Sequence, residues 1–68
     1  MASLTPRETQ VARLLAQGYT PKEVAVLLGV QLQTVRARIK HASARLPGPH
    51  APMIRVILWA VRESQTLA

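Results

Sequence analysis

Two segments of this chain open with the same pattern: a threonine, a proline, a basic residue and a glutamate. They are Thr5 to Glu8 (TPRE) and Thr20 to Glu23 (TPKE). A threonine hydroxyl accepts from free N–H groups at a helix start, proline fits the first helical position, and a glutamate three residues after the cap can bond back to it. Each pattern therefore predicts a helix start, and we interpret both glutamates as structural caps.

Glycine and proline mark where the helices end. Gly18 and Gly29 follow the first two apolar segments, and the run Pro47-Gly48-Pro49 follows a third. Apolar residues recur at helical spacing between these breaks, and no stretch alternates as a strand would. We therefore predict an all-α fold, with one domain over residues 1–68 and helices over about residues 6–17, 21–28, 32–46 and 52–65.

The segment from Pro21 to Leu46 combines a short helix, a glycine turn and a longer basic helix. In the short helix we expect three residues to face inward: Val24, Leu27 and Leu28. Ala25 is small where two helices would cross closely, and Val30 and Val35 can fill the space between them. This layout is that of the helix-turn-helix, which places its second helix in the major groove of duplex DNA.

The charge of the chain indicates the same partner. Nine Lys and Arg residues outweigh three acidic residues, so the net charge is +6. Residues 31–46 contain no acidic residue and carry four of the cations, namely Arg36, Arg38, Lys40 and Arg45. A small body with charge concentrated in this way attracts polyanions, which favours double-stranded DNA as the partner.

The third predicted helix has two distinct faces when residues are placed about 100° apart. Its core stripe comprises Val35, Ile39, Ala42 and Leu46. The opposite face carries the predicted base-facing residues, which are Gln33, Arg36, Ala37 and Lys40. Arginine and lysine suit guanine, glutamine suits adenine, and alanine lets the backbone approach. The predicted contacts to the DNA backbone are Lys22, Thr34, Arg38 and Arg45.

The last predicted helix carries two apolar stripes. One consists of Ile54, Ile57, Leu58 and Val61, and the other of Met53, Val56, Ala60 and Leu67 with Trp59 at its edge. A terminal helix of a small monomer can bury one stripe against its own core but not both. We therefore predict a homodimer through the second stripe, at Met53, Val56, Trp59 and Ala60. The alternative is deeper burial of this stripe beneath the third helix, or a frayed end of the chain.

Several functional classes are disfavoured. The chain has no cysteine, and His41 and His50 lack further ligands at suitable spacing, so we expect no metal and no cofactor. The three glutamates are scattered and no nucleophile motif or phosphate loop is present, so we expect neither an enzyme nor a small-molecule substrate. The longest apolar run, Val56 to Val61, is far shorter than the ~20 residues of a membrane span, and with no targeting signal we expect a cytoplasmic protein.

Four motifs together resemble the LuxR/GerE-type helix-turn-helix domain over about residues 4–62. They are LTPRE at 4–8 with Val11, LLAQGYTPKEVA at 14–25, LGV at 28–30 and TVR at 34–36. The resemblance implies a four-helix DNA-binding transcription regulator that reads the major groove with its third helix and dimerises through its fourth on inverted half-sites. By position it implies Arg36, Ala37 and Lys40 as base-facing, with Lys22, Gln33 and Thr34 on the backbone.

Two details qualify the resemblance. The family usually has Ser or Thr where this chain has Gln31, so we expect a weakly capped third helix. The segment TVRARIK at 34–40 is also similar, more distantly, to region 4 of sigma factors, which reads a promoter element and touches RNA polymerase. The alternative function is therefore a sigma-region-4-like module that docks on RNA polymerase.

Overall fold

The computed structural model describes residues 4–66, with side chains described for residues 4–64. Within that span the chain forms helices only: α1 (Pro6–Ala16), α2 (Pro21–Leu28), α3 (Leu32–Ala44) and α4 (Pro52–Thr66). The all-α prediction is confirmed. The predicted ends were wrong by one or two residues for three helices, because α1 stops at Ala16, α3 stops at Ala44 and α4 continues to Thr66. Leu67 lies outside the described residues.

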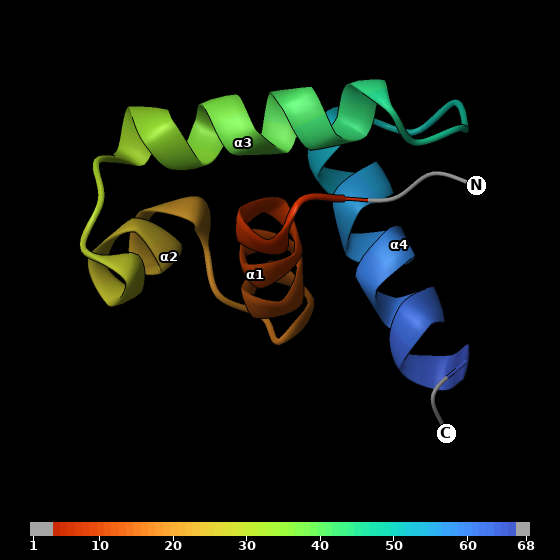
Figure 1. Ribbon diagram of the computed structural model, residues 1–68, viewed down its shortest axis with the longest axis horizontal. Coiled ribbons are helices and arrows are strands. Elements are labelled where there is room, and N and C mark those ends of the chain that lie inside the picture. The colour runs from red at the N-terminus through yellow and green to blue at the C-terminus, as the bar shows by residue number, and fades with distance from the viewer. Residues whose placement is uncertain (1–3, 67–68) are drawn as a thin grey trace.

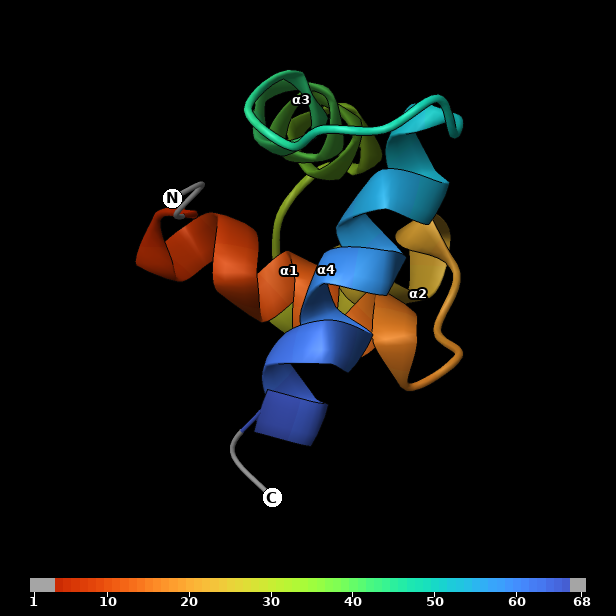
Figure 2. The same ribbon diagram turned by 90° about the vertical axis from the view of Figure 1, so that its right-hand side faces the viewer.

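The helices are arranged so that α3 lies along one edge of the molecule with the other helices on its inner side (Figure 1). In that view α2 lies beneath the first turns of α3, α4 descends from its far end, and α1 lies between them. Seen from the side, α3 is viewed nearly end-on and no other helix covers its outer surface (Figure 2). Both α1 and α3 pack against each of the other three helices, whereas α2 and α4 each pack against α1 and α3.

Both predicted capping boxes are present. At the start of α1, Thr5 Oγ1 accepts from the Glu8 N–H at 3.2 Å, and the Thr5 N–H donates to Glu8 Oε1 at 3.0 Å. Thr20 and Glu23 make the same two bonds at 3.2 and 2.9 Å. Gly29 ends α2 with a left-handed φ of 68°, and Gln31 makes no side-chain cap bond at α3, as the sequence predicted. Side-chain caps therefore stabilise the first turns of α1 and α2, whereas the first turn of α3 has no such cap and depends on tertiary packing.

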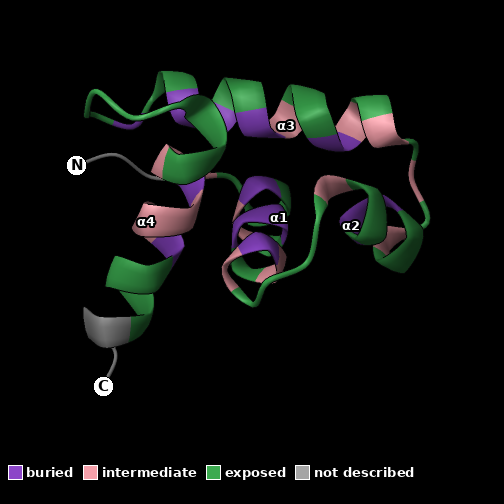
Figure 3. Ribbon diagram, turned by 180° about the vertical axis from the view of Figure 1, so that it is seen from behind, coloured by how far each residue is buried: buried purple, intermediate pink, exposed green. Residues whose placement is uncertain are grey.

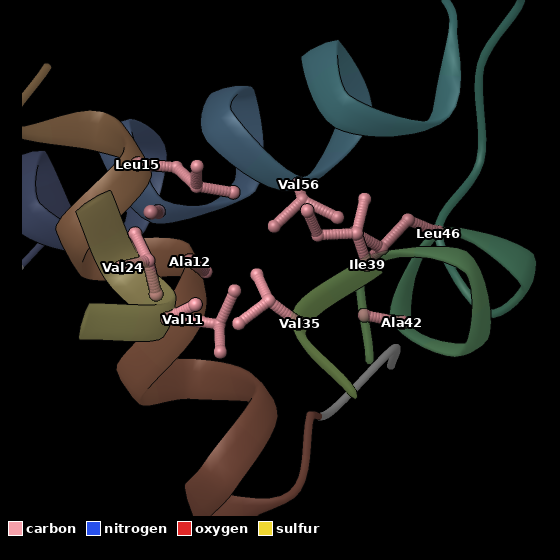
Figure 4. Close-up of a cluster of buried hydrophobic side chains, with 11 residues drawn as sticks. Val11, Ala12, Leu15, Val24, Val35, Ile39, Ala42, Leu46 and Val56 are labelled. Atoms are coloured by element: carbon pink, nitrogen blue, oxygen red, sulfur yellow. The ribbon is translucent and has the colours of Figure 1, made fainter. Parts of the chain in front are cut away.

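The core contains one fully buried valine from each helix: Val11, Val24, Val35 and Val56. Figure 4 shows their side chains converging on one interior, with Leu15 and Ile39 beside them. The predicted core stripe of α3 is confirmed, since Val35, Ile39, Ala42 and Leu46 are all buried. This stripe fixes the rotation of α3 about its axis, and thus the direction in which its opposite face points.

One inward prediction in α2 is wrong. Leu27 is 56% exposed and Val26 is 76% exposed, whereas Val24 and Ala25 are buried. The eight residues of α2 pack against α1 and α3 only, so its buried arc is narrow. At 100° per residue that arc is centred between Val24 and Ala25, which turns Leu27 toward solvent.

The assignment of the two stripes of α4 is also wrong. Val56 is fully buried and Ala60 is 5% exposed, so these residues belong to the monomer core and cannot reach a second copy. Trp59 is half-buried and packs against the same core, and only Met53 of the predicted set is exposed. The reason is that α4 packs on α1 and α3 together, and the small Ala60 one turn after Val56 suits this close contact. The exposed stripe contains Ile54 and Val61 instead.

Candidate nucleic-acid interface

The outward face of α3 is open along its length. Its four predicted base-facing residues are all exposed: Gln33, Arg36, Ala37 and Lys40. The opposite side of the same helix is buried against the other elements, which Figure 3 shows as purple bands beneath a green outer surface. A rigid helix with one buried and one fully accessible side has the form that a major groove can accept.

The composition of α3 suits a polyanion. Its sequence, LQTVRARIKHASA, contains three cations and no acidic residue. Ala37 and Ala44 are exposed on the outward face, so the helix backbone is not held away by bulky side chains there. Arginine and lysine next to these small side chains can reach base edges while the helix lies close to the DNA.

The predicted backbone contacts occupy different environments. Lys22 is exposed in the first turn of α2, while Thr34 and Arg38 are half-buried on the flank of α3. These three residues lie to the side of the outward face or on a neighbouring helix. Their positions agree with contacts to phosphates rather than to bases.

Arg45 differs from the other predicted contacts, because its guanidinium donates to the carboxylate of Glu8. Glu8 is buried, and its side chain also accepts from the Thr5 N–H. The bond from Arg45 is the main reason that the pKa of Glu8 lies below its ordinary value, against the opposing effect of burial. Arg45 is therefore engaged by a carboxylate of the protein itself, although its side chain is 45% exposed, which weakens its case as a DNA contact.

Sequence reasoning missed this ion pair, although a signal was present. Glu8 falls on the same stripe as Val11, Ala12 and Leu15, at positions i, i+3, i+4 and i+7 of α1. A carboxylate on a buried stripe needs a cationic or hydrogen-bonding partner. The capping interpretation of Glu8 was confirmed, but it accounts for only one of its two carboxylate oxygens.

A second missed group is Arg55, which holds the turn between α3 and α4. Its Nε donates to the carbonyl of His50 at 2.7 Å, and its terminal nitrogen donates to the carbonyl of Ser43 at 3.4 Å. Ser43 is itself buried and donates to the Lys40 carbonyl at 2.9 Å. Arg55 therefore connects the first turn of α4 to the last turn of α3.

Among residues 4–66, no three side chains of histidine, cysteine, aspartate or glutamate come together as metal ligands would. In the same part of the chain, none of the helices combines the length and apolar character needed to cross a bilayer.

Comparison with family models matches residues 2–50 to the luxR family of bacterial regulatory proteins, also described as GerE. The chain belongs to this family. Membership makes it a DNA-binding transcription regulator of the helix-turn-helix class, and it confirms the resemblance seen in the sequence. No curated protein and no solved structure gave a significant match.

The matched residues cover α1, α2 and α3 and end in the turn before α4. The outward face of α3 lies wholly inside the match, so this LuxR-family chain has its candidate interface in the matched part. The helix α4 lies beyond the match, although the sequence resemblance extended to about residue 62.

Proposed function

We propose that this LuxR-family chain regulates transcription by inserting α3 into the major groove of duplex DNA. The observation that carries the proposal is the outward face of α3, where Gln33, Arg36, Ala37 and Lys40 are exposed opposite a fully buried stripe. Because the buried stripe fixes the rotation of α3, these four side chains point in one direction without a conformational change. The resulting preorganisation lowers the entropic cost of binding.

Each residue of this face has a distinct role in the proposal. Arg36 and Lys40 donate to O6 and N7 of guanine, and Gln33 pairs with N6 and N7 of adenine. Ala37 lies one residue after Arg36 and offers a methyl group for apolar contact with thymine. Lys22, Thr34 and Arg38 contact phosphates and set the position of α3 in the groove without adding base preference.

We further propose that two copies bind together through α4. Its exposed stripe, defined by Ile54, Leu58 and Val61, follows the i, i+4, i+7 spacing of a helix seam. Ile54 is 46% exposed and Val61 is 38% exposed, and Leu58 between them is half-buried. Burial of these apolar side chains against the same stripe of a second copy gives a two-fold symmetric pair. Its two α3 helices would then read half-sites about 34–36 Å apart.

The test is selection of bound duplexes from a random DNA pool by the full chain. We expect an inverted repeat whose half-sites lie one helical turn apart, with affinity that falls steeply as salt is raised. Recovery of a single unrepeated site would overturn the proposed dimer. It would not contradict the proposal that α3 binds in the major groove. Absence of any selected duplex, together with DNA-independent binding to RNA polymerase, would replace the proposal with the docking alternative.

A further inference from the structure

A depression lies where the start of α1, the end of α2 and the flank of α3 meet. Its volume is about 430 Å³, and it is lined by Pro6, Arg7, Gln10, Leu28, Val30 and Arg38. Two arginines and one glutamine, from two different helices, thus line the same space. The lining includes no acidic residue of the described chain.

The nearest acidic residue is committed elsewhere. Glu8 follows Arg7 directly, but its side chain turns to the buried side of α1, where Arg45 and the Thr5 N–H bind its two oxygens. In the described part of the chain, no ion pair engages Arg7 or Arg38. Like charges that converge without a counterion attract an anion into the space between them.

The residue types specify the anion. A guanidinium presents N–H donors in a planar fork that matches two phosphate oxygens, and a glutamine amide adds a further donor. The depression is open and wide enough for a tetrahedral phosphate group. Leu28 and Val30 line the side toward the glycine turn, so the polar contacts come from Arg7, Gln10 and Arg38.

We infer that this depression binds a backbone phosphate of the DNA, next to the groove that α3 enters. The inference rests on the proposed function, because α3 must lie in the groove to bring a phosphate to its flank. It extends the interface from the helix-turn-helix to α1, with Arg7 acting beside Arg38.

The first experiment compares two variants that each remove one exposed cation from α1. Arg7 lines the depression, whereas Arg13 lies six residues further along, about 9 Å along the helix axis, and lines other surfaces. Affinity for the selected duplex is measured over a range of salt concentrations for the parent, Arg7→Ala and Arg13→Ala. We expect the slope of log affinity against log salt to become shallower by about 0.9 for Arg7→Ala and to stay unchanged for Arg13→Ala. Base preference should be the same in all three.

The second experiment identifies the phosphate. Duplexes carry one neutral methylphosphonate in place of a phosphate, at successive positions beside the half-site. At one position we expect the methylphosphonate to lower the affinity of the parent for the duplex. At the same position it should not lower the affinity of Arg7→Ala any further, because this variant already lacks the cation. If the affinity of Arg7→Lys falls when the methylphosphonate is at this position, a positive charge at residue 7 is sufficient for the phosphate contact.

The outcomes separate this inference from the proposed function. The phosphate site would be overturned if Arg7→Ala had the same salt slope as the parent, or if Arg7→Ala and Arg13→Ala changed the slope equally. The proposed function would still stand in either case if Lys40→Ala altered base preference. A chain that bound no duplex at all would overturn both. Circular dichroism of each variant checks that the helices are intact, which we expect because Arg7 is exposed.

Discussion

Arg45 at the end of α3 donates to the carboxylate of Glu8 in the first turn of α1, so that an ion pair joins these two helices. The same carboxylate caps α1 through the Thr5 N–H. One buried side chain thus takes part both in the cap of α1 and in a contact between α1 and α3. We expect a substitution of either partner to change the orientation of α3 relative to α1.

The pH dependence of stability should report this pair. The pKa of Glu8 is lowered in the folded chain, so its contribution is fully present above its ordinary unfolded value and is lost as the pH falls through the lower folded value. We expect the free energy of unfolding to fall with acidification in that window, measured by urea denaturation. In Arg45→Ala the free energy of unfolding should fall less over the same pH range. An equal fall would contradict the conclusion that Arg45 is the main cause of the lowered pKa of Glu8.

Glu23 provides the matched comparison. Its pKa is also lowered, chiefly by the bond from the Thr20 N–H, but it is exposed and has no arginine partner. Replacing Glu23 by Gln should therefore change the pH dependence less than replacing Glu8 by Gln. The comparison uses the same denaturation series, and equal effects would show that capping alone controls the titration.

Base readout should depend on the outward face of α3. Lys40→Ala and Arg36→Ala should each cost about 1–3 kcal/mol of binding free energy and relax preference at one base position. The measurement is competition between the selected duplex and single-base variants of it. Arg13→Ala removes the same charge away from α3 and should leave the preference unchanged. Unaltered preference in both α3 variants would refute the groove assignment.

The two sides of α4 should separate stability from self-association. Val56→Ala removes buried methyl groups and should lower the free energy of unfolding by about 2 kcal/mol. Leu58→Lys places a charge on the exposed stripe and should shift the dimer to monomer with a smaller effect on folding. Sedimentation and denaturation of both variants provide the check, and a dimer that survives Leu58→Lys would exclude this stripe as the interface.

The start of α3 can be strengthened. Gln31 is at the cap position with extended backbone angles but makes no side-chain cap bond. Serine there can accept from the free N–H groups of the first turn, and we expect Gln31→Ser to stabilise the chain by about 0.5–1 kcal/mol relative to Gln31→Ala. Thermal denaturation of the pair is the test. Equal stability would mean that tertiary packing already satisfies that end of α3.

Local signals made most of the fold predictable. The two TPxE patterns, Gly29 and the stripe from Val35 to Leu46 each depend on residues close in sequence, and the structure has the predicted caps, turn and core face. The ends of α1 and α3 shifted because their last turns contain no residue that requires continuation or termination at one position.

Features that depend on long-range packing were harder to predict. Both stripes of α4 have helical spacing and apolar character, and only the positions of α1 and α3 decide that Val56 faces inward. Leu27 was misplaced for the same reason, because the positions of α1 and α3 decide which side of α2 is buried. Glu8 and Arg45 are 37 residues apart in sequence, so the stripe of α1 indicates that Glu8 needs a partner but not that Arg45 supplies it.

The two sides of α4 also bear on how relatives of this chain can diverge. Val56 and Ala60 must keep their size to hold the core, whereas Ile54, Leu58 and Val61 meet no such demand from the monomer. Duplicated copies could therefore exchange residues on the outer stripe and cease to recognise one another without any change in α3. If two copies pair through α4 as proposed, partner choice and operator choice would be separately inheritable traits within a chain of 68 residues.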